Sequence, residues 1–166
     1  MLKILGTVLI LLASAGIGFS KSLDMYEHLR QLQELHKLFQ YIRSELQYTR
    51  APFAEVFEKI GRKANPPFDS WLFVLASRLQ KKGTGSFCEI WKETIQEKLQ
   101  ECRLCEEEFE ELKQIGKSLE YMESIDLYIE QLEYKIEHTR EEYKTKKKLC
   151  QSMGIMGGIF LVILLL

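Results

Sequence analysis

The sequence lacks an excess of charge of either sign. Lys and Arg number 23 against 24 Asp and Glu, which gives a formal net charge of −1. A protein that binds DNA or RNA through the phosphates usually presents a basic excess, so this balance does not suggest a nucleic-acid partner. Internal repeats and low-complexity tracts are absent too. Residues 20–148, where nearly all the charges lie, are enough for one helical domain but not comfortably for two.

Signals for a sheet and for an enzyme are also missing. No segment alternates apolar and polar residues, so no sheet is expected and the fold class is all-α. Residues 82–86 read Lys-Gly-Thr-Gly-Ser, without the Gly-Lys-Ser/Thr ending and preceding strand of a phosphate-binding loop, and are interpreted as a turn between helices. The acidic runs have no His placed to tune them for acid–base catalysis. We therefore expect no enzyme and no cofactor.

Cysteines are few, at positions 88, 102, 105 and 150. They fit reduced thiols better than a disulfide framework, because the chain is neither small nor, in this interpretation, secreted. Cys102-x-x-Cys105 has the spacing of a metal-ligand pair and would share one face of a helix. A structural zinc site needs four ligands, however, and His28, His36 and His138 are not paired nearby. We expect no metal site and interpret these cysteines as half-buried helix thiols.

Long apolar runs occur at both ends and nowhere else. Residues 1–20 and 149–166 are almost free of charge, and each is predicted to be a transmembrane anchor around a cytoplasmic domain at 21–148. An alternative for the N-terminus is a signal peptide cleaved near Ala13-Ser14-Ala15. The apolar run continues past that point to Phe19, which favours a retained anchor.

Orientation follows from lysines next to the second anchor, since basic residues stay on the cytoplasmic side of a membrane. Nothing basic follows them, so both termini are expected outside and the middle of the chain inside. These topology residues are Lys144, Lys146, Lys147 and Lys148.

Apolar spacing of three and four predicts six helices in the middle of the chain. The first runs from near Leu23 to near Tyr48 and continues from the first anchor. Pro52 suits the first turn of a second helix over 53–60, which Gly61 would end in the left-handed conformation. Pro66-Pro67 precedes a third helix, for which Gly83 is the predicted stop. The residues expected on the buried face of the first helix are Leu29, Leu32, Leu35, Phe39, Ile42 and Leu46.

A capping box, Ser86 with Glu89, predicts the start of the fourth helix, because each side chain satisfies a free backbone N–H of the first turn. A fifth helix and a last one, from about Glu123, complete the set. Their expected core residues are Cys88, Trp91, Ile95 and Leu99, then Phe109, Leu112, Ile115 and Leu119, then Tyr128, Leu132 and Ile136.

Two sets of residues are candidates for contacts. The first is the acidic run within residues 106–111, which is interpreted as a solvated helix face; the alternative is that it docks a basic surface of a partner. Ser14-x-x-x-Gly18 and Gly154-x-x-x-Gly158 place small side chains on one face of each anchor, which allows another transmembrane helix to approach closely. The candidate docking residues are Glu106, Glu107, Glu108, Glu110 and Glu111.

An ordered set of short segments along the whole chain resembles the stage III sporulation protein AB family of endospore-forming bacteria. Ala51, Glu120 and Glu123 depart from the family pattern, and Ala51 would remove a helix cap. The segments that carry the resemblance are Met1-Leu2-Lys3, Gly6, Leu9 to Ala13, Gly18-Phe19, Arg30-Gln31-Leu32, Glu45-Leu46-x-Tyr48, Pro52-Phe53-x-Glu55, Trp71-Leu72-Phe73, Gly116-x-x-Leu119 and Gly154 to Leu166.

The resemblance implies a component of the transport complex between mother cell and forespore. The family's soluble part is similar to the cytoplasmic domain of type II secretion F proteins, on which a hexameric ATPase acts. It implies as partners the sporulation ATPase, stage III sporulation protein AA, other stage III sporulation membrane proteins and the lipid bilayer, with self-association left open. The implied location is the mother-cell membrane facing the forespore, with the soluble domain in the mother-cell cytoplasm. A generic membrane-anchored helical scaffold unrelated to secretion is the alternative.

Overall fold

The structure is a computed structural model. It describes the backbone of residues 2–49, 51–81, 85–119 and 122–165, and the side chains of 23–49, 51–81, 85–119, 124–149, 152 and 156.

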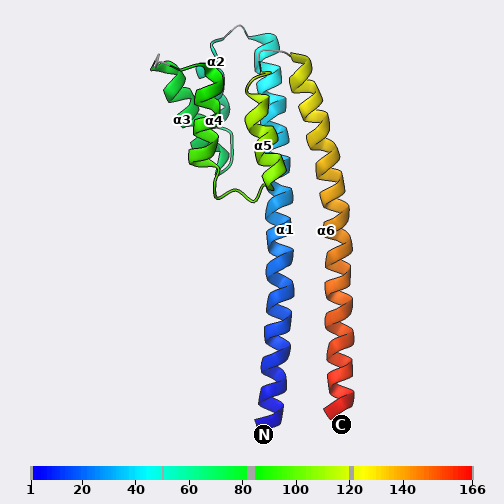
Figure 1. Ribbon diagram of the computed structural model, residues 1–166. Helices are drawn as coiled ribbons and strands as arrows, with labels where there is room; N and C mark the ends of the chain where they lie inside the picture. Colours follow the sequence, from blue (N-terminus) through cyan, green and yellow to red (C-terminus); the bar gives the residue numbers. More distant parts are fainter. Residues whose placement is uncertain (1, 50, 82–84, 120–121, 166) are drawn as a thin grey trace. The chain divides into compact units, whose positions relative to one another are not determined.

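Six helices make up the described chain, and no strand occurs in it (Figure 1). The all-α fold class and the number of helices are therefore confirmed. The chain divides into two compact units, one of residues 1–29 with 137–166 and one of residues 30–136. The helices are α1 (Leu2–Tyr48), α2 (Phe53–Gly61), α3 (Phe68–Gln80), α4 (Phe87–Lys98), α5 (Glu106–Ile115) and α6 (Met122–Leu165).

The described backbone of the two predicted anchors, residues 2–20 and 149–165, is helical and belongs to α1 and α6. Within the residues whose side chains are described, no helix has an apolar stretch long enough to cross a bilayer. The side chains of residues 1–20 and of nearly all of 149–166 lie outside the described set. The flanking transmembrane helices stay a prediction of the sequence.

The predicted apolar face of α1 lies in the core of the 30–136 unit. Leu32, Leu35, Phe39 and Ile42 are buried, whereas Leu46 is only half-buried. Burial of a large apolar side chain contributes roughly 1.5–3 kcal/mol, so these positions hold α1 against the shorter helices.

Aromatic rings fill the centre of this unit. The ring centroids of Trp71 and Trp91 are 4.9 Å apart, and those of Phe39 and Tyr128 are 4.6 Å apart, both pairs edge to face. This geometry places the positive ring edge against the negative face of its partner. The Trp71 indole nitrogen donates to Thr94 Oγ1 at 3.3 Å, so the buried polar atom of Trp71 is paired. Five of the six helices contribute to the core through these residues and through Phe57.

Two connections between short helices are tied to α1 by single polar side chains. Gln31, which is buried, accepts a hydrogen bond from the backbone N–H of Arg103 at 2.6 Å. Glu34 accepts from the backbone N–H of Asn65 at 3.1 Å. Each hydrogen bond links a connection between two short helices, α4–α5 or α2–α3, to a side chain of α1.

The capping box at the start of α4 is confirmed. Ser86 Oγ accepts from the backbone N–H of Glu89, and the Glu89 carboxylate accepts from the backbone N–H of Ser86 at 2.9 Å. The start of α2 differs, since Pro52 stands at its N-cap without a side-chain hydrogen bond to the helix.

The predicted role of Gly61 is wrong. No glycine in the described chain has a positive φ, and Gly61 is the last residue of α2, followed by Arg62 in the right-handed helical region. Gly61 is buried, and a methyl group at this position would lie 3.3 Å from Cβ of Leu72. A glycine here therefore allows α2 to approach α3 closely. Gly83, the predicted stop of the third helix, lies outside the described residues.

Candidate functional site

The five glutamates of α5 do not share one exposed face. Glu106 and Glu107 are exposed in the first turn, where negative charge interacts favourably with the helix dipole. Glu108 is buried, and its carboxylate accepts from the backbone N–H of Cys105 at 2.8 Å. The prediction of an uninterrupted solvated face is wrong at Glu108, because this residue completes the N-terminal cap of α5.

The two remaining glutamates of the run form ion pairs. Glu110 is exposed and accepts from Lys113 Nζ at 2.7 Å. Glu111 is partly buried and accepts from Lys135 Nζ of α6 at 2.6 Å. The exposed acidic surface of α5 thus consists mainly of Glu106 and Glu107, and whether it docks a partner stays a prediction.

Tyr128 shows that the inner side of α5 is closed to solvent. Burial raises the pKa of the Tyr128 phenol, and the nearby carboxylates of Glu111 and Glu108 raise it further. The phenol therefore stays neutral, and its ring packs against Phe39. This side of α5 contributes to the core.

Cys102 and Cys105 lie in the connection between α4 and α5, so their predicted place on a helix is wrong. Burial raises the pKa of the Cys102 thiol to about 11, and burial is also the main cause that raises the pKa of Cys105. The thiolate is the reactive form of cysteine, so both shifts lower the fraction of reactive thiolate at these residues. Among residues with described side chains, no group of three or more His, Cys, Asp or Glu is placed to hold a metal. The side chain of Cys150 is outside that set.

The lysines before the second predicted anchor are exposed on α6 and partly paired. Lys144 Nζ donates to Glu141 at 2.8 Å and Lys146 Nζ to Glu142 at 3.0 Å, and these hydrogen bonds are the first cause of the lowered pKa of each glutamate. Lys147 Nζ lies 5.7 Å from the ring centroid of Tyr143, and Lys148 is exposed.

An aromatic pair beside these lysines was not found from the sequence. The ring centroids of Tyr26 on α1 and Tyr143 on α6 are 6.2 Å apart, within the unit of residues 1–29 and 137–166. Tyrosines are enriched where membrane proteins leave the bilayer, so the position of each tyrosine a few residues from a predicted anchor, on the side of the central domain, was an available signal. The predicted packing residues Ser14, Gly18, Gly154 and Gly158 lie outside the set with described side chains.

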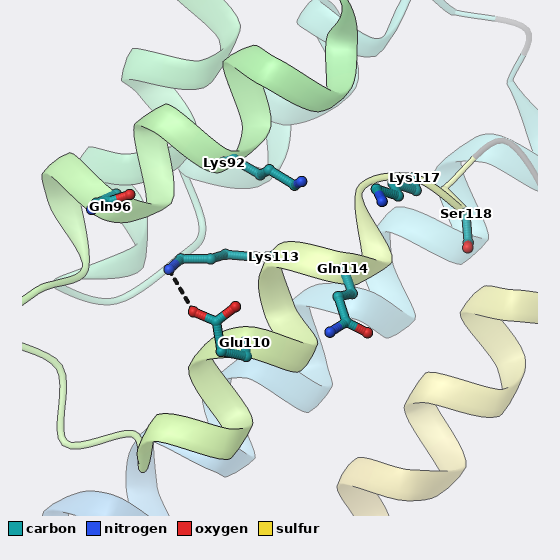
Figure 2. A pocket seen from close by; sticks show the side chains of 7 residues that line it. All are labelled: Lys92, Gln96, Glu110, Lys113, Gln114, Lys117 and Ser118. Carbon is teal, nitrogen blue, oxygen red and sulfur yellow. Dashed lines mark hydrogen bonds and ion pairs between the residues drawn. The ribbon is translucent and has the colours of Figure 1, made fainter.

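A polar hollow of about 560 Å³ between α4 and α5 was also missed (Figure 2). Helical spacing was an available signal for this hollow. Lys92 and Gln96 are four residues apart on α4, and the polar residues from Glu110 to Lys117 recur at spacings of three and four on the α5 side. The lining residues are Lys92, Gln96, Glu110, Lys113, Gln114, Lys117 and Ser118.

The fold and these surfaces define an all-α protein whose described chain has two long helices, α1 and α6, first and last in sequence, and four shorter charged helices in the sequence between. The model of the stage III sporulation protein AB family matches residues 3–166, so the chain belongs to that family. The chain is 27% identical to stage III sporulation protein AB of Bacillus subtilis (strain 168) over 172 aligned positions that cover 100% of both proteins. A solved structure of a stage III sporulation protein AB has a TM-score of 0.66 at 22% identity. That match covers 71% of this chain and 97% of the solved one, which shows a shared fold.

Proposed function

We propose that this protein is a non-enzymatic membrane platform of the transport complex between mother cell and forespore, and that it docks the sporulation ATPase, stage III sporulation protein AA. The observation that carries the proposal is the family match over residues 3–166. The similarity of the family's soluble part to type II secretion F proteins supplies the ATPase as the partner. Other stage III sporulation membrane proteins would be its neighbours in the bilayer.

The surfaces of the chain support a membrane-bound arrangement. In the sequence, the apolar runs within residues 1–20 and 149–166 have about the length that a transmembrane anchor needs, and four lysines among residues 144–148 precede the second one. Tyr26 and Tyr143 lie near the ends of these runs as interfacial residues would. The helical unit would then face the mother-cell cytoplasm, from the membrane that surrounds the forespore.

The docking surface is assigned to Glu106 and Glu107, because both are exposed and neither forms an ion pair within the described part of the chain. A motor domain with a basic surface would find there two adjacent charges at a helix N-terminus. Complementary charge of this kind raises the association rate and fixes orientation.

The experiment replaces the protein in a sporulating strain with charge-reversed variants. Glu106→Lys with Glu107→Lys should reduce the ATPase recovered with the membrane protein and the yield of heat-resistant spores. The matched control is Glu130→Lys with Glu133→Lys, which changes the same charge at exposed positions of α6. Normal ATPase recovery with both variants would contradict docking at α5. Loss of sporulation with unchanged ATPase recovery would favour a scaffold that does not dock the motor.

A further inference from the structure

The hollow between α4 and α5 is basic in a chain that is otherwise balanced in charge. Three lysines and one glutamate line it, together with Gln96, Gln114 and Ser118. Figure 2 shows Lys92 and Gln96 on α4 opposite Lys113 on α5, with Lys117 just after the end of α5. The local charge is thus positive although the formal net charge of the protein is −1.

A buried contact brings two of these lysines to the same hollow. The Trp91 indole nitrogen donates to the main-chain oxygen of Leu112 at 2.8 Å, and the Trp91 ring lies against Gly116. Lys92 directly follows Trp91, and Lys117 directly follows Gly116. Because the buried residues are fixed in the core, their neighbours are held at the surface on either side of the hollow.

The charges in the hollow are not balanced from within. Glu110 is the only carboxylate of the lining, and it is already paired with Lys113, whose ammonium also lies 4.7 Å from the centroid of the Phe109 ring. Lys92 and Lys117 form no ion pair with any residue in the described part of the chain. By contrast, Lys59 and Lys144, two exposed lysines outside the hollow, do form ion pairs with glutamates. Two like charges at one hollow repel each other and favour a negatively charged ligand.

The lining favours one chemical class of ligand. Lysine ammonium groups act as point charges with several donor directions, whereas compact phosphate sites more often use the planar fork of arginine or a nest of backbone N–H groups. The donors here are distributed along two helices, and the amides of Gln96 and Gln114 can both donate to and accept from a peptide backbone. An extended segment with carboxylates some residues apart matches this distribution better than a single phosphate.

We propose that the α4–α5 hollow binds an acidic peptide segment of a partner protein, with carboxylates held by Lys92 and Lys117 and the peptide backbone held by Gln96 and Gln114. This site is separate from the acidic Glu106–Glu107 surface and has the opposite charge. It does not depend on the ATPase being the partner.

The test uses the full-length chain in lipid nanodiscs and a fluorescein-labelled peptide in which aspartate and glutamate alternate with glycine. Fluorescence anisotropy should show saturable binding, and a peptide with asparagine and glutamine in place of the acids should not bind. Lys92→Gln with Lys117→Gln should weaken binding by at least about tenfold, which corresponds to loss of about 1.4 kcal/mol. Circular dichroism checks that the variant stays folded.

The matched control is Lys63→Gln with Lys81→Gln, which removes the same charge from exposed positions outside the hollow. It should leave the affinity within about twofold, since diffuse attraction between opposite charges is weak at physiological salt. Equal losses in the two double variants, or no preference for the acidic peptide, would overturn the proposal. Displacement by inorganic phosphate at concentrations as low as those of the peptide would assign the hollow to phosphate instead and overturn the choice of a peptide.

Discussion

The Trp91 indole nitrogen donates a 2.8 Å hydrogen bond to the main-chain oxygen of Leu112, and this bond joins α4 to the last turn of α5. The contact needs a glycine at position 116, because a methyl group there would lie 2.6 Å from Cγ of Trp91. Gly116 itself has right-handed helical angles that any residue can adopt. Steric room for the indole ring, not backbone freedom, is therefore what the glycine provides.

Gly116→Ala should destabilise the protein by about 1–3 kcal/mol, the usual cost of overpacking a core. The clash is with a rigid, fully buried ring that cannot rotate away. Urea unfolding of the full-length chain in detergent, followed by the fluorescence of its two buried tryptophans, measures the change.

Gly61→Ala is the control for this substitution. Its methyl group would meet Leu72 Cβ at 3.3 Å, a contact that a small shift relieves, and alanine favours the helix. Equal losses at the two glycines would show that the indole contact is not the cause.

Ser86→Ala should lower the free energy of unfolding by about 1 kcal/mol, because the backbone N–H of Glu89 loses its acceptor at the start of α4. Ser86→Asp keeps an acceptor and should have a much smaller effect. Thermal unfolding of the three proteins decides the point. Equal melting temperatures for Ser86→Ala and the unchanged protein would mean that the cap does not contribute.

Cys105→Ser should stabilise the protein by up to about 1 kcal/mol. Cysteine stands at the N-cap of α5, where sulfur is a weak acceptor and a serine hydroxyl is among the preferred groups. The exposed position means that little apolar burial is lost. Cys102→Ser is the matched control, and it should give no gain, since Cys102 is half-buried and not at a cap. A lower melting temperature for Cys105→Ser would contradict this account of the cap.

Glu45 and Lys59 make a pH-dependent link between α1 and α2, with 2.7 Å between the Lys59 ammonium and the carboxylate. The hydrogen bond from Lys59 is the largest cause of the lowered pKa of Glu45. A carboxylate whose pKa is lowered by folding contributes its full stabilisation when the pH is above 4.5, the ordinary pKa of the group. That contribution is lost as the pH falls through the lowered pKa of the folded protein.

Lys59→Met should therefore lower the melting temperature at neutral pH, and the difference from the unchanged protein should narrow as the pH falls below 4.5. Lys81→Met is the control, because it removes an exposed lysine that forms no ion pair in the described part of the chain. The difference in melting temperature between this variant and the unchanged protein should not change with pH. If the melting temperatures of Lys59→Met and of the unchanged protein differed by the same amount down to strongly acidic pH, the ion pair would be excluded as the cause of that difference.

Local signals in the sequence predicted most of the fold. The spacing of Leu32, Leu35 and Phe39 indicated the buried face of α1, and Ser86 with Glu89 indicated the start of α4. Both signals come from residues a few positions apart in one helix, so they can be recognised in the sequence alone.

Features that depend on which helices pack together could not be predicted in the same way. Gly61 and Gly116 have the residue type of a helix stop, yet each makes room for a side chain more than ten residues away in sequence. Glu108 was counted with its acidic neighbours, although the cap turns it inward. Helical spacing groups the polar residues of the α4–α5 hollow on each helix, but the packing of Trp91 against Leu112 and Gly116, which joins the two helices, is not encoded in either helix alone.

The measurement that tests the central claim most directly is binding of the full-length protein in nanodiscs to the purified sporulation ATPase. Calorimetry with nucleotide present and absent would be combined with the ATPase rate. A platform for the motor predicts saturable binding that depends on nucleotide and is weakened by Glu106→Lys with Glu107→Lys. Absence of binding in both nucleotide states, with an unchanged ATPase rate, would contradict the account.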